Sequence, residues 1–156
     1  MVQYSKAPYL IISACLVGVA CRYDGQSRCL PQLKKLVDSG AAIALCPEEL
    51  GGLPTPRSPA EIQGDRVINE AGHDVTPEFE RGARAVLKIA QENGISRAIL
   101  KERSPSCGSK FIYDGSFSRV LIPGEGVTTA LLRRSGITVR SEDNIFDAAE
   151  EGSEKI

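Results

Sequence analysis

Short apolar runs that alternate with helical patterns set the strongest constraint on what this chain can fold into. The first run, residues 9–14 (YLIISA), is continuous, as is typical of a strand buried on both faces. Strand and helix patterns in alternation predict right-handed crossovers and a mostly parallel sheet, so we expect an α/β fold, a Rossmann-like three-layer sandwich. The expected strands are 9–14, 41–45, 97–100 and 137–139, and the expected helices are 30–39, 76–94 and 127–134.

Two small β-hairpins are expected to decorate this sheet. Residues 62–68 turn at Gly64-Asp65, and residues 111–113 and Phe117 flank a turn at Asp114-Gly115. The hydroxyl of Thr76 is expected to cap the long helix, since Thr-Pro-Glu is a typical helix opening. We expect the tail after Asp143 to form a helix that frays.

The 156 residues are the length of one ordinary domain. Hydrophobic residues make up 42% and charged residues 25%, as in soluble globular proteins. No repeat, low-complexity segment or long Gly, Ser or Pro linker divides the sequence. We therefore predict a single domain over 1–156, with a core at about 9–141 and a frayed tail at 142–156.

The charge balance argues against polyanionic partners. The chain carries 19 basic and 20 acidic side chains, mixed along the sequence, and a formal net charge of -1. Such a chain creates no strong field to attract nucleic acid or anionic lipid, so a small-molecule partner fits better. The polar N-terminal residues 1–8 and the short apolar run after them do not fit a signal peptide or membrane span, and we expect a cytoplasmic protein.

Three of the five cysteines follow predicted strands. Cys15 follows the first strand, Cys46 the second, and Cys107 lies in the loop after the third. The carboxyl ends of parallel strands meet at one edge of a sheet, where ligands bind, so these three thiols are expected to converge. A disulfide framework is not expected, because the cytoplasm keeps thiols reduced and five cysteines cannot all pair.

Converging thiolates leave several kinds of site open. They select zinc, Cu(I) or an iron–sulfur cluster. A zinc module would need a fourth ligand, for which Cys21 or Glu48 is the candidate, because the only histidine, His73, lies in a polar turn and is expected at the surface. A metal-free sulfurtransferase that carries persulfide on a low-pKa Cys107 is the other alternative.

Longer motifs around these cysteines resemble one known family. They are ISACLVG at 12–18, CRYDG at 21–25, CPE at 46–48, GGLPTPR at 51–57, PAEI at 59–62, DVT at 74–76, ILKE at 99–102, SPSCG at 104–108 and YDG at 113–115. Together they are similar to the thiouracil desulfidase family over about residues 12–137. The resemblance implies non-redox removal of sulfur from thiolated uracil on a [4Fe-4S] cluster. It also implies that Cys15, Cys46 and Cys107 are the ligands and that Cys21 and Cys29 are not.

Such a reaction needs groups beside the cluster. An open iron would polarise the C=S bond, a water would replace the sulfur, and hydrosulfide would leave. Glu48, two residues from a predicted ligand, is the expected general base, and Ser104 or Ser106, with Ser104 preferred, would hydrogen-bond the heterocycle or relay a proton. Each of these has a plain structural alternative, a solvated acid or an ordinary turn hydroxyl.

The expected substrate is a thiolated nucleobase or nucleoside. Four further side chains could line its pocket, because planar donors and an aromatic face suit a pyrimidine ring: Arg57, Arg22, Tyr23 and Lys101. Each could equally be a surface ion-pair partner. A cluster-assembly partner is a further candidate, and the sequence predicts neither whether a partner loads the cofactor nor the oligomeric state.

Overall fold

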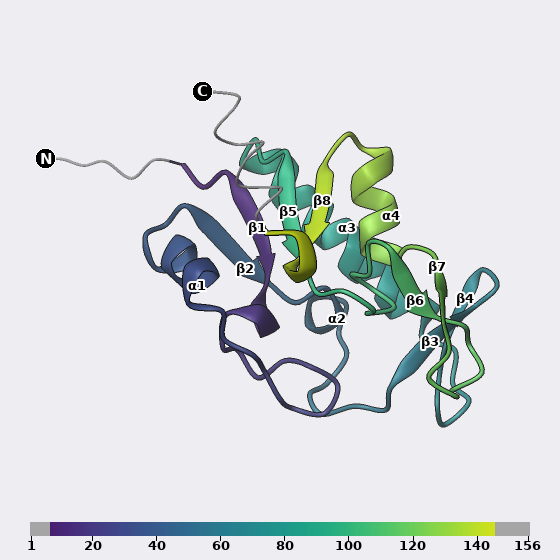
Figure 1. Cartoon of the computed structure of the whole chain (residues 1–156). Coiled ribbons are helices and arrows are strands. Elements are labelled where there is room, and N and C mark those ends of the chain that lie inside the picture. Colours follow the sequence, from purple (N-terminus) through teal and green to yellow (C-terminus); the bar gives the residue numbers. More distant parts are fainter. Residues whose placement is uncertain (1–6, 146–156) are drawn as a thin grey trace, which may run out of the picture.

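Four parallel strands form the central sheet of the chain, whose computed structural model describes residues 7–145 (Figure 1). The strands are β1 (Leu10–Ser13), β2 (Ala42–Leu45), β5 (Arg97–Leu100) and β8 (Thr138–Ser141), in the order β2-β1-β5-β8. The chain goes from β1 to one side to form β2 and to the other side to form β5. The predicted parallel sheet is confirmed, and its strand order reverses beside β1.

The two faces of the sheet are covered by different helices. On one face, Ile12 of β1 belongs to a core with Leu33 of α1 (Pro31–Asp38). On the other face, Ile11 belongs to a core with Val86 of α3 (Thr76–Glu92) and Leu132 of α4 (Val127–Arg134). Alternate residues of β1 therefore enter opposite cores, and the expected three-layer sandwich is confirmed.

The start of α3 differs from the prediction in one respect. The hydroxyl of Thr76 does not cap the helix, because it accepts a hydrogen bond from the N–H of Val67 in the neighbouring hairpin. The N-cap residue is Val75, and the carboxylate of Asp74, one residue earlier, accepts the N–H of Thr76 at 2.9 Å. Thr76 therefore ties the hairpin to the helix.

Both predicted hairpins are present, in Figure 1 to one side of the sheet. The first pairs β3 (Ala60–Gln63) with β4 (Arg66–Asn69), as expected. The second pairs β6 (Phe111–Tyr113) with β7 (Leu121–Pro123), so the expectation that Phe117 flanks a tight turn at Asp114-Gly115 is wrong. Phe117 has a left-handed backbone with φ 58°, as does Arg119 with φ 61°, and both belong to a wide loop at 114–120.

A short helix that the sequence did not predict, α2 (Pro47–Leu50), directly follows Cys46. Two glycines allow its backbone to touch α3: a Cβ atom at Gly51 would overlap the Glu78 carbonyl, and one at Gly82 would overlap the Pro47 carbonyl. Likewise, a Cβ atom at Gly126, before α4, would overlap the backbone of Ser106. Loops near the thiols thus rest on helices with no layer of side chains between them.

After β8 the chain makes a 3₁₀ turn at Glu142–Asn144. Glu142 accepts the N–H of Glu102 and forms an ion pair with Lys101 at 3.1 Å. Residues 146–156, most of the predicted tail, lie outside the described residues, as do residues 1–6 of the polar N-terminal segment. Among the described residues, no helix has the length and hydropathy that a membrane span requires.

Candidate active site at the carboxyl edge of the sheet

A cavity of about 690 Å³ lies at the edge where β1, β2 and β5 end. The three cysteines predicted to converge all line it, although they come from loops far apart in the sequence. The other predicted site residues that line it are Glu48, Ser104, Arg57, Arg22, Tyr23 and Lys101. The structure therefore brings the loops of Cys15, Cys46 and Cys107 together at the predicted edge of the sheet.

Cys15 lies in the 3₁₀ turn Ala14–Leu16 that continues β1. Its thiol is buried and lies beside the thiol of Cys21, which donates a hydrogen bond and lowers the pKa of Cys15, whereas burial opposes this shift. The positive charges of Lys101 and Arg22 lower the same pKa. This part of the cavity therefore favours a thiolate.

Cys46 precedes the first residue of α2, where helix N–H groups are free. A hydrogen bond from the Cys21 thiol and one from the N–H of Glu49 lower the pKa of Cys46 to about 7, against the effects of burial and of the Glu48 charge. Hydrogen bonding with Cys15 and with Cys46, followed by burial, strongly raises the pKa of Cys21, whose single S–H can serve only one of the two sulfur atoms at a time. The sequence did not predict that Cys21 lies between the two expected ligands.

Cys107 lies in a different environment. Burial raises the pKa of its thiol to about 12, although the hydroxyls of Ser13 and Ser106 lower it. The N–H groups at the start of α4 fix this loop: Val127 donates to the carbonyl of Pro105, and Thr128 to that of Ser106. Without a bound metal or cluster, Cys107 is a buried neutral thiol.

Glu48 and Arg57 form a buried ion pair, with the guanidinium Nε 2.8 Å from Glu48 Oε1. Burial raises the pKa of Glu48, and the charge of Arg57 counteracts part of that effect. Arg57 also donates to the carbonyls of Pro54 and Cys21 and to the hydroxyl of Thr55. Arg57 therefore fixes the carboxylate of Glu48 and ties α2 to the Cys21 loop.

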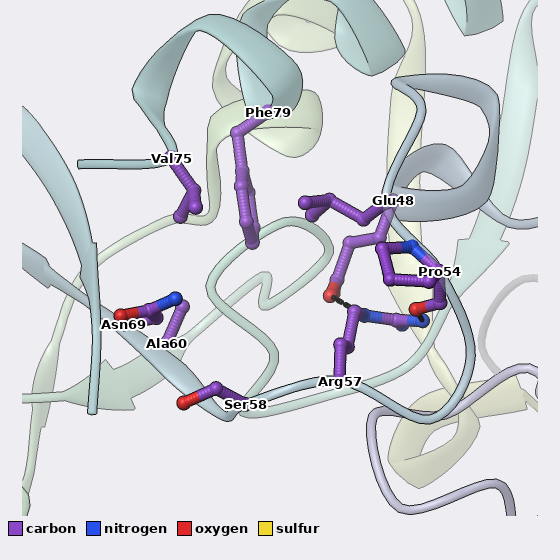
Figure 2. Close-up of a pocket in the computed structure, with 9 residues that line it drawn as sticks. Glu48, Pro54, Arg57, Ser58, Ala60, Asn69, Val75 and Phe79 are labelled. Carbon is purple, nitrogen blue, oxygen red and sulfur yellow. Dashed lines mark hydrogen bonds and ion pairs between the residues drawn. The ribbon is translucent and has the colours of Figure 1, made fainter. Parts of the chain in front are cut away.

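A second, smaller cavity of about 170 Å³ adjoins this ion pair (Figure 2). Figure 2 shows Phe79 and Val75 of the α3 region across from Glu48, with Asn69 of β4 and Ser58, which precedes β3, also lining the cavity. Glu48 and Arg57 line both cavities, so the ion pair lies between them.

The two candidate serines have different surroundings. Ser104 lines the large cavity, and its Oγ accepts the N–H groups of Ser106 and Cys107 at 3.0 Å each, so its own O–H remains to donate. Ser106 is buried, and its hydroxyl lies 2.8 Å from that of Thr128 in α4. Of the two, Ser104 is the one placed to reach a ligand in the cavity.

The other predicted pocket residues also have roles in the loops. Lys101 binds the carbonyl of Glu102 as well as Glu142. Tyr23 is 43% exposed, and its carbonyl accepts the N–H of Arg57. Arg22 is half-buried beside Cys15. The expected aromatic face and cations are thus present at the cavity. His73 is exposed, as expected.

Sequence reasoning missed one side of the cavity. Glu102 is buried and accepts the N–H groups of Arg103, Ser109 and Lys110 and the hydroxyl of Ser109, so it organises the loop that carries Cys107. Desolvation raises the pKa of Glu102, but these hydrogen bonds outweigh it and the net shift is downward. The other charged and aromatic lining residues that the sequence did not single out come mainly from the hairpins: Glu61, Glu70, Arg103, Tyr113, Phe117 and Arg119.

The donor set can be compared with the cofactors that the sequence left open. Cys21, Cys46 and Glu49 are close enough to share one metal ion, with ligand atoms within 4.8 Å of one another. Glu49, however, is exposed and accepts the hydroxyl of Thr55 at 2.6 Å, and a structural zinc ion requires a fourth ligand. Iron–sulfur clusters are held by cysteine thiolates, so Cys15, Cys46 and Cys107, which come from three loops and line one cavity, fit such a cluster.

Comparisons with known proteins agree with this assessment. Residues 10–144 match the model of the family described as 2-thiouracil desulfurase. A solved structure titled [4Fe-4S]-dependent thiouracil desulfidase TudS is 53% identical, with a TM-score of 0.90 over 94% of this chain and 98% of that chain. The uncharacterized protein YbbK of Bacillus subtilis strain 168 is 45% identical over 148 residues, which cover 88% of this chain and 98% of the relative.

Proposed function

Because the chain belongs to the 2-thiouracil desulfurase family, we propose that it is an enzyme that removes sulfur from a thiolated pyrimidine with a [4Fe-4S] cluster. Thiouracil and water would yield uracil and hydrosulfide, so oxygen replaces sulfur without net oxidation or reduction. One observation carries the proposal: thiols from three separate loops line one cavity together with Glu48 and Ser104.

The ligands in this proposal are Cys15, Cys46 and Cys107. When bound, the cluster supplies a soft Lewis acid that attracts the sulfur of a thiocarbonyl and makes its carbon more reactive. The lowered pKa values of Cys15 and Cys46 favour the thiolate form that metal binding requires. Cys107 loses its proton when it binds the cofactor.

Glu48 is the general base for the attacking water. Its raised pKa makes the carboxylate a better proton acceptor than an exposed glutamate, and Arg57 holds it in one orientation. The charge of Glu48 raises the pKa of both Cys46 and Cys107, an effect that places the carboxylate near two of the ligands. The proximity of Glu48 to two of the proposed ligands supports its role as the base for a water beside the cluster.

Ser104 orients the heterocycle. Its Oγ is fixed by two backbone N–H groups, and its hydroxyl proton can be donated to a ring nitrogen or to the oxygen that forms. Ser106 has a structural role in this proposal, because its hydroxyl is hydrogen-bonded to Thr128.

The persulfide alternative requires a low-pKa Cys107, but burial raises the pKa of that thiol to about 12. The zinc alternative uses Cys21 as a ligand, so it predicts that the bound metal depends on Cys21. The expected absence of a nucleic-acid partner and the candidate cluster-assembly partner stay predictions.

The test is anaerobic reconstitution followed by iron and sulfide analysis and by the absorbance of 2-thiouracil. The wild type should hold about four iron and four sulfide per chain and consume thiouracil. Alanine at Cys15, Cys46 or Cys107 should abolish both, whereas Cys21→Ala should keep the iron. Cys29→Ala is the matched control, because Cys29 is exposed and is not among the lining residues described.

Three results would contradict the proposal. Activity in the metal-free protein would favour the persulfide reaction. One tightly bound zinc that depends on Cys21 would favour the zinc module. Cluster retention in all three ligand variants would refute the ligand set.

A further inference from the structure

The hairpins contribute a second side to the cavity, which we call the hairpin side: Glu61, Tyr113, Phe117 and Arg119. Glu61 belongs to β3, Tyr113 ends β6, and the other two belong to the loop 114–120. The described cysteine loops contribute one aromatic residue to the cavity, Tyr23, whereas the hairpin side contributes two.

The loop 114–120 is held in an unfavourable backbone conformation. Phe117 and Arg119 both have positive φ, which costs conformational energy in residues other than glycine. Such strain persists only where the surroundings enforce it, and it is frequent at ligand-binding sites. Here the strained residues line the same cavity as the thiols.

Contacts from the first hairpin enforce this conformation. Glu61 is 9% exposed, and its Oε1 accepts the N–H of Gly115 at 2.9 Å and that of Phe117 at 3.1 Å. Gln63 donates from its side-chain amide to the carbonyl of Gly115 at 2.8 Å. A Cβ atom at Gly115, which has φ 94°, would be 2.8 Å from the Ile62 carbonyl. The two hairpins are therefore joined through Glu61, which holds the backbone of Phe117 in place.

We propose that Phe117 contacts the pyrimidine ring of the substrate and that Glu61 is the positioning residue that holds Phe117 at the cavity. This inference rests on the proposed function, because it assigns a ring-binding surface to the same site. A planar heterocycle gains affinity from the face or edge of an aromatic side chain, and this contact is not available from the thiol loops except at Tyr23. Phe117 thus acts in substrate binding and not in the chemical step.

Phe117→Ala tests the contact, with Phe111→Ala as its matched control. Phe111 lies in the same hairpin, is 44% exposed and is not among the lining residues. Loss of base stacking on an aromatic ring weakens binding by about 5-fold or more. We therefore expect Phe117→Ala to raise the KM for 2-thiouracil and the dissociation constant for uracil, measured by calorimetry, by about that factor. The iron content should be unchanged, and Phe111→Ala should match the wild type.

Variants of Glu61 test the positioning role. Glu61→Ala removes the acceptor of both N–H groups and should raise KM as Phe117→Ala does, with kcat much less affected. Glu61→Gln keeps an acceptor oxygen and should restore most of the affinity. If the negative charge of Glu61 were what matters, the glutamine variant would bind as weakly as Glu61→Ala. The double variant Glu61→Ala with Phe117→Ala should be no worse than the poorer single variant, because both remove one contact.

The outcomes separate this inference from the proposed function. An active wild type whose KM and uracil affinity are unaffected by Phe117→Ala would overturn the inference and leave the desulfidase in place. Equal effects of Phe111→Ala and Phe117→Ala would also overturn it, since they would indicate damage to the hairpin. Cluster-loaded wild type that binds uracil but does not consume thiouracil would refute the proposed function instead.

Discussion

The thiol loops and the hairpin side enclose the same cavity but are held in place by different interactions. The thiol loops leave the ends of buried strands, and two of them contact helices backbone to backbone at Gly51, Gly82 and Gly126. The residues of the hairpin side belong to two two-stranded hairpins, which are joined by side-chain hydrogen bonds of Glu61 and Gln63. The positions of the thiols are therefore fixed by the core, whereas the hairpin side of the cavity depends on a few polar contacts.

This difference agrees with the two proposed roles, because the thiol loops would bind the cluster and the hairpin side would bind the substrate ring. Ligands of one cofactor must keep their separations, and backbone contacts allow little adjustment. A surface that recognises a small planar molecule tolerates more variation, because stacking depends less on exact geometry than metal coordination does.

The largest expected effect comes from Gly82→Ala in α3. In an ordinary helix this change stabilises by about 0.5–1 kcal/mol, since glycine has the larger entropy in the unfolded chain. Here the new Cβ would overlap the Pro47 carbonyl, so α2 must move away and we expect a loss of about 2–3 kcal/mol in the free energy of unfolding. Urea denaturation measures the stability, and iron content measures the displacement of Cys46.

Arg84→Ala is the control for Gly82→Ala, because Arg84 lies on the exposed face of the same helix. It should change the stability by less than about 0.5 kcal/mol. A stabilised Gly82→Ala variant with normal iron content would show that the backbone contact does not fix the thiol side.

The second-largest loss of stability is expected for Glu102→Gln. This variant sharpens the comparison, because the loop of Cys107, like the hairpin side with Glu61, is organised by a buried carboxylate. The variant weakens charge-assisted hydrogen bonds to Ser109 and Lys110 and should cost about 2 kcal/mol near neutral pH. The folded-state pKa of Glu102 is lowered, so its stabilisation is full above the ordinary value of 4.5 and is lost as the pH falls through the folded-state pKa.

Urea midpoints across acid pH test this expectation. The difference between wild type and Glu102→Gln should be largest near neutrality and should shrink below about pH 4. A constant difference at all pH values would mean that the carboxylate charge is not what organises the loop.

The smallest effect is expected at the junction of the first hairpin with α3. Asp74→Ala removes the acceptor of the Thr76 N–H and the ion pair with Arg66, and should cost about 1 kcal/mol. The matched variant Arg66→Ala removes only the exposed ion pair and should cost less than about 0.5 kcal/mol. Thermal unfolding measures both. Loss of cluster in Asp74→Ala would show that the two sides of the cavity are more strongly coupled than we infer.

The sheet and its helices could be predicted because apolar periodicity reports burial in regular structure. The runs that became β1, β2 and β5 each end before a cysteine loop, and this sufficed to bring Cys15, Cys46 and Cys107 to one edge. The role of each lining residue stays a prediction, since periodicity carries no information on chemistry.

The features that escaped prediction depend on irregular backbone. The four residues of α2 are too few to show a helical period. The path of the loop that brings Cys21 between Cys15 and Cys46 follows from hydrogen bonds such as Arg28 N–H to the Cys15 carbonyl, which no pattern encodes. To predict the hairpin side, one would have to know that the backbone of Phe117 is left-handed and that Glu61 accepts the N–H of Phe117.

The glycine contacts also bear on how such an enzyme could acquire new substrates. At Gly51, Gly82 and Gly126 every other side chain collides with backbone, so these positions offer selection almost no viable variants. Beyond Gly115, the loop 114–120 can by contrast change in sequence and length while the core stays intact. A library designed to accept another thiocarbonyl compound should therefore randomise residues 116–120 and keep Gly115 together with the three glycines, because the chemistry and the choice of substrate can then evolve separately.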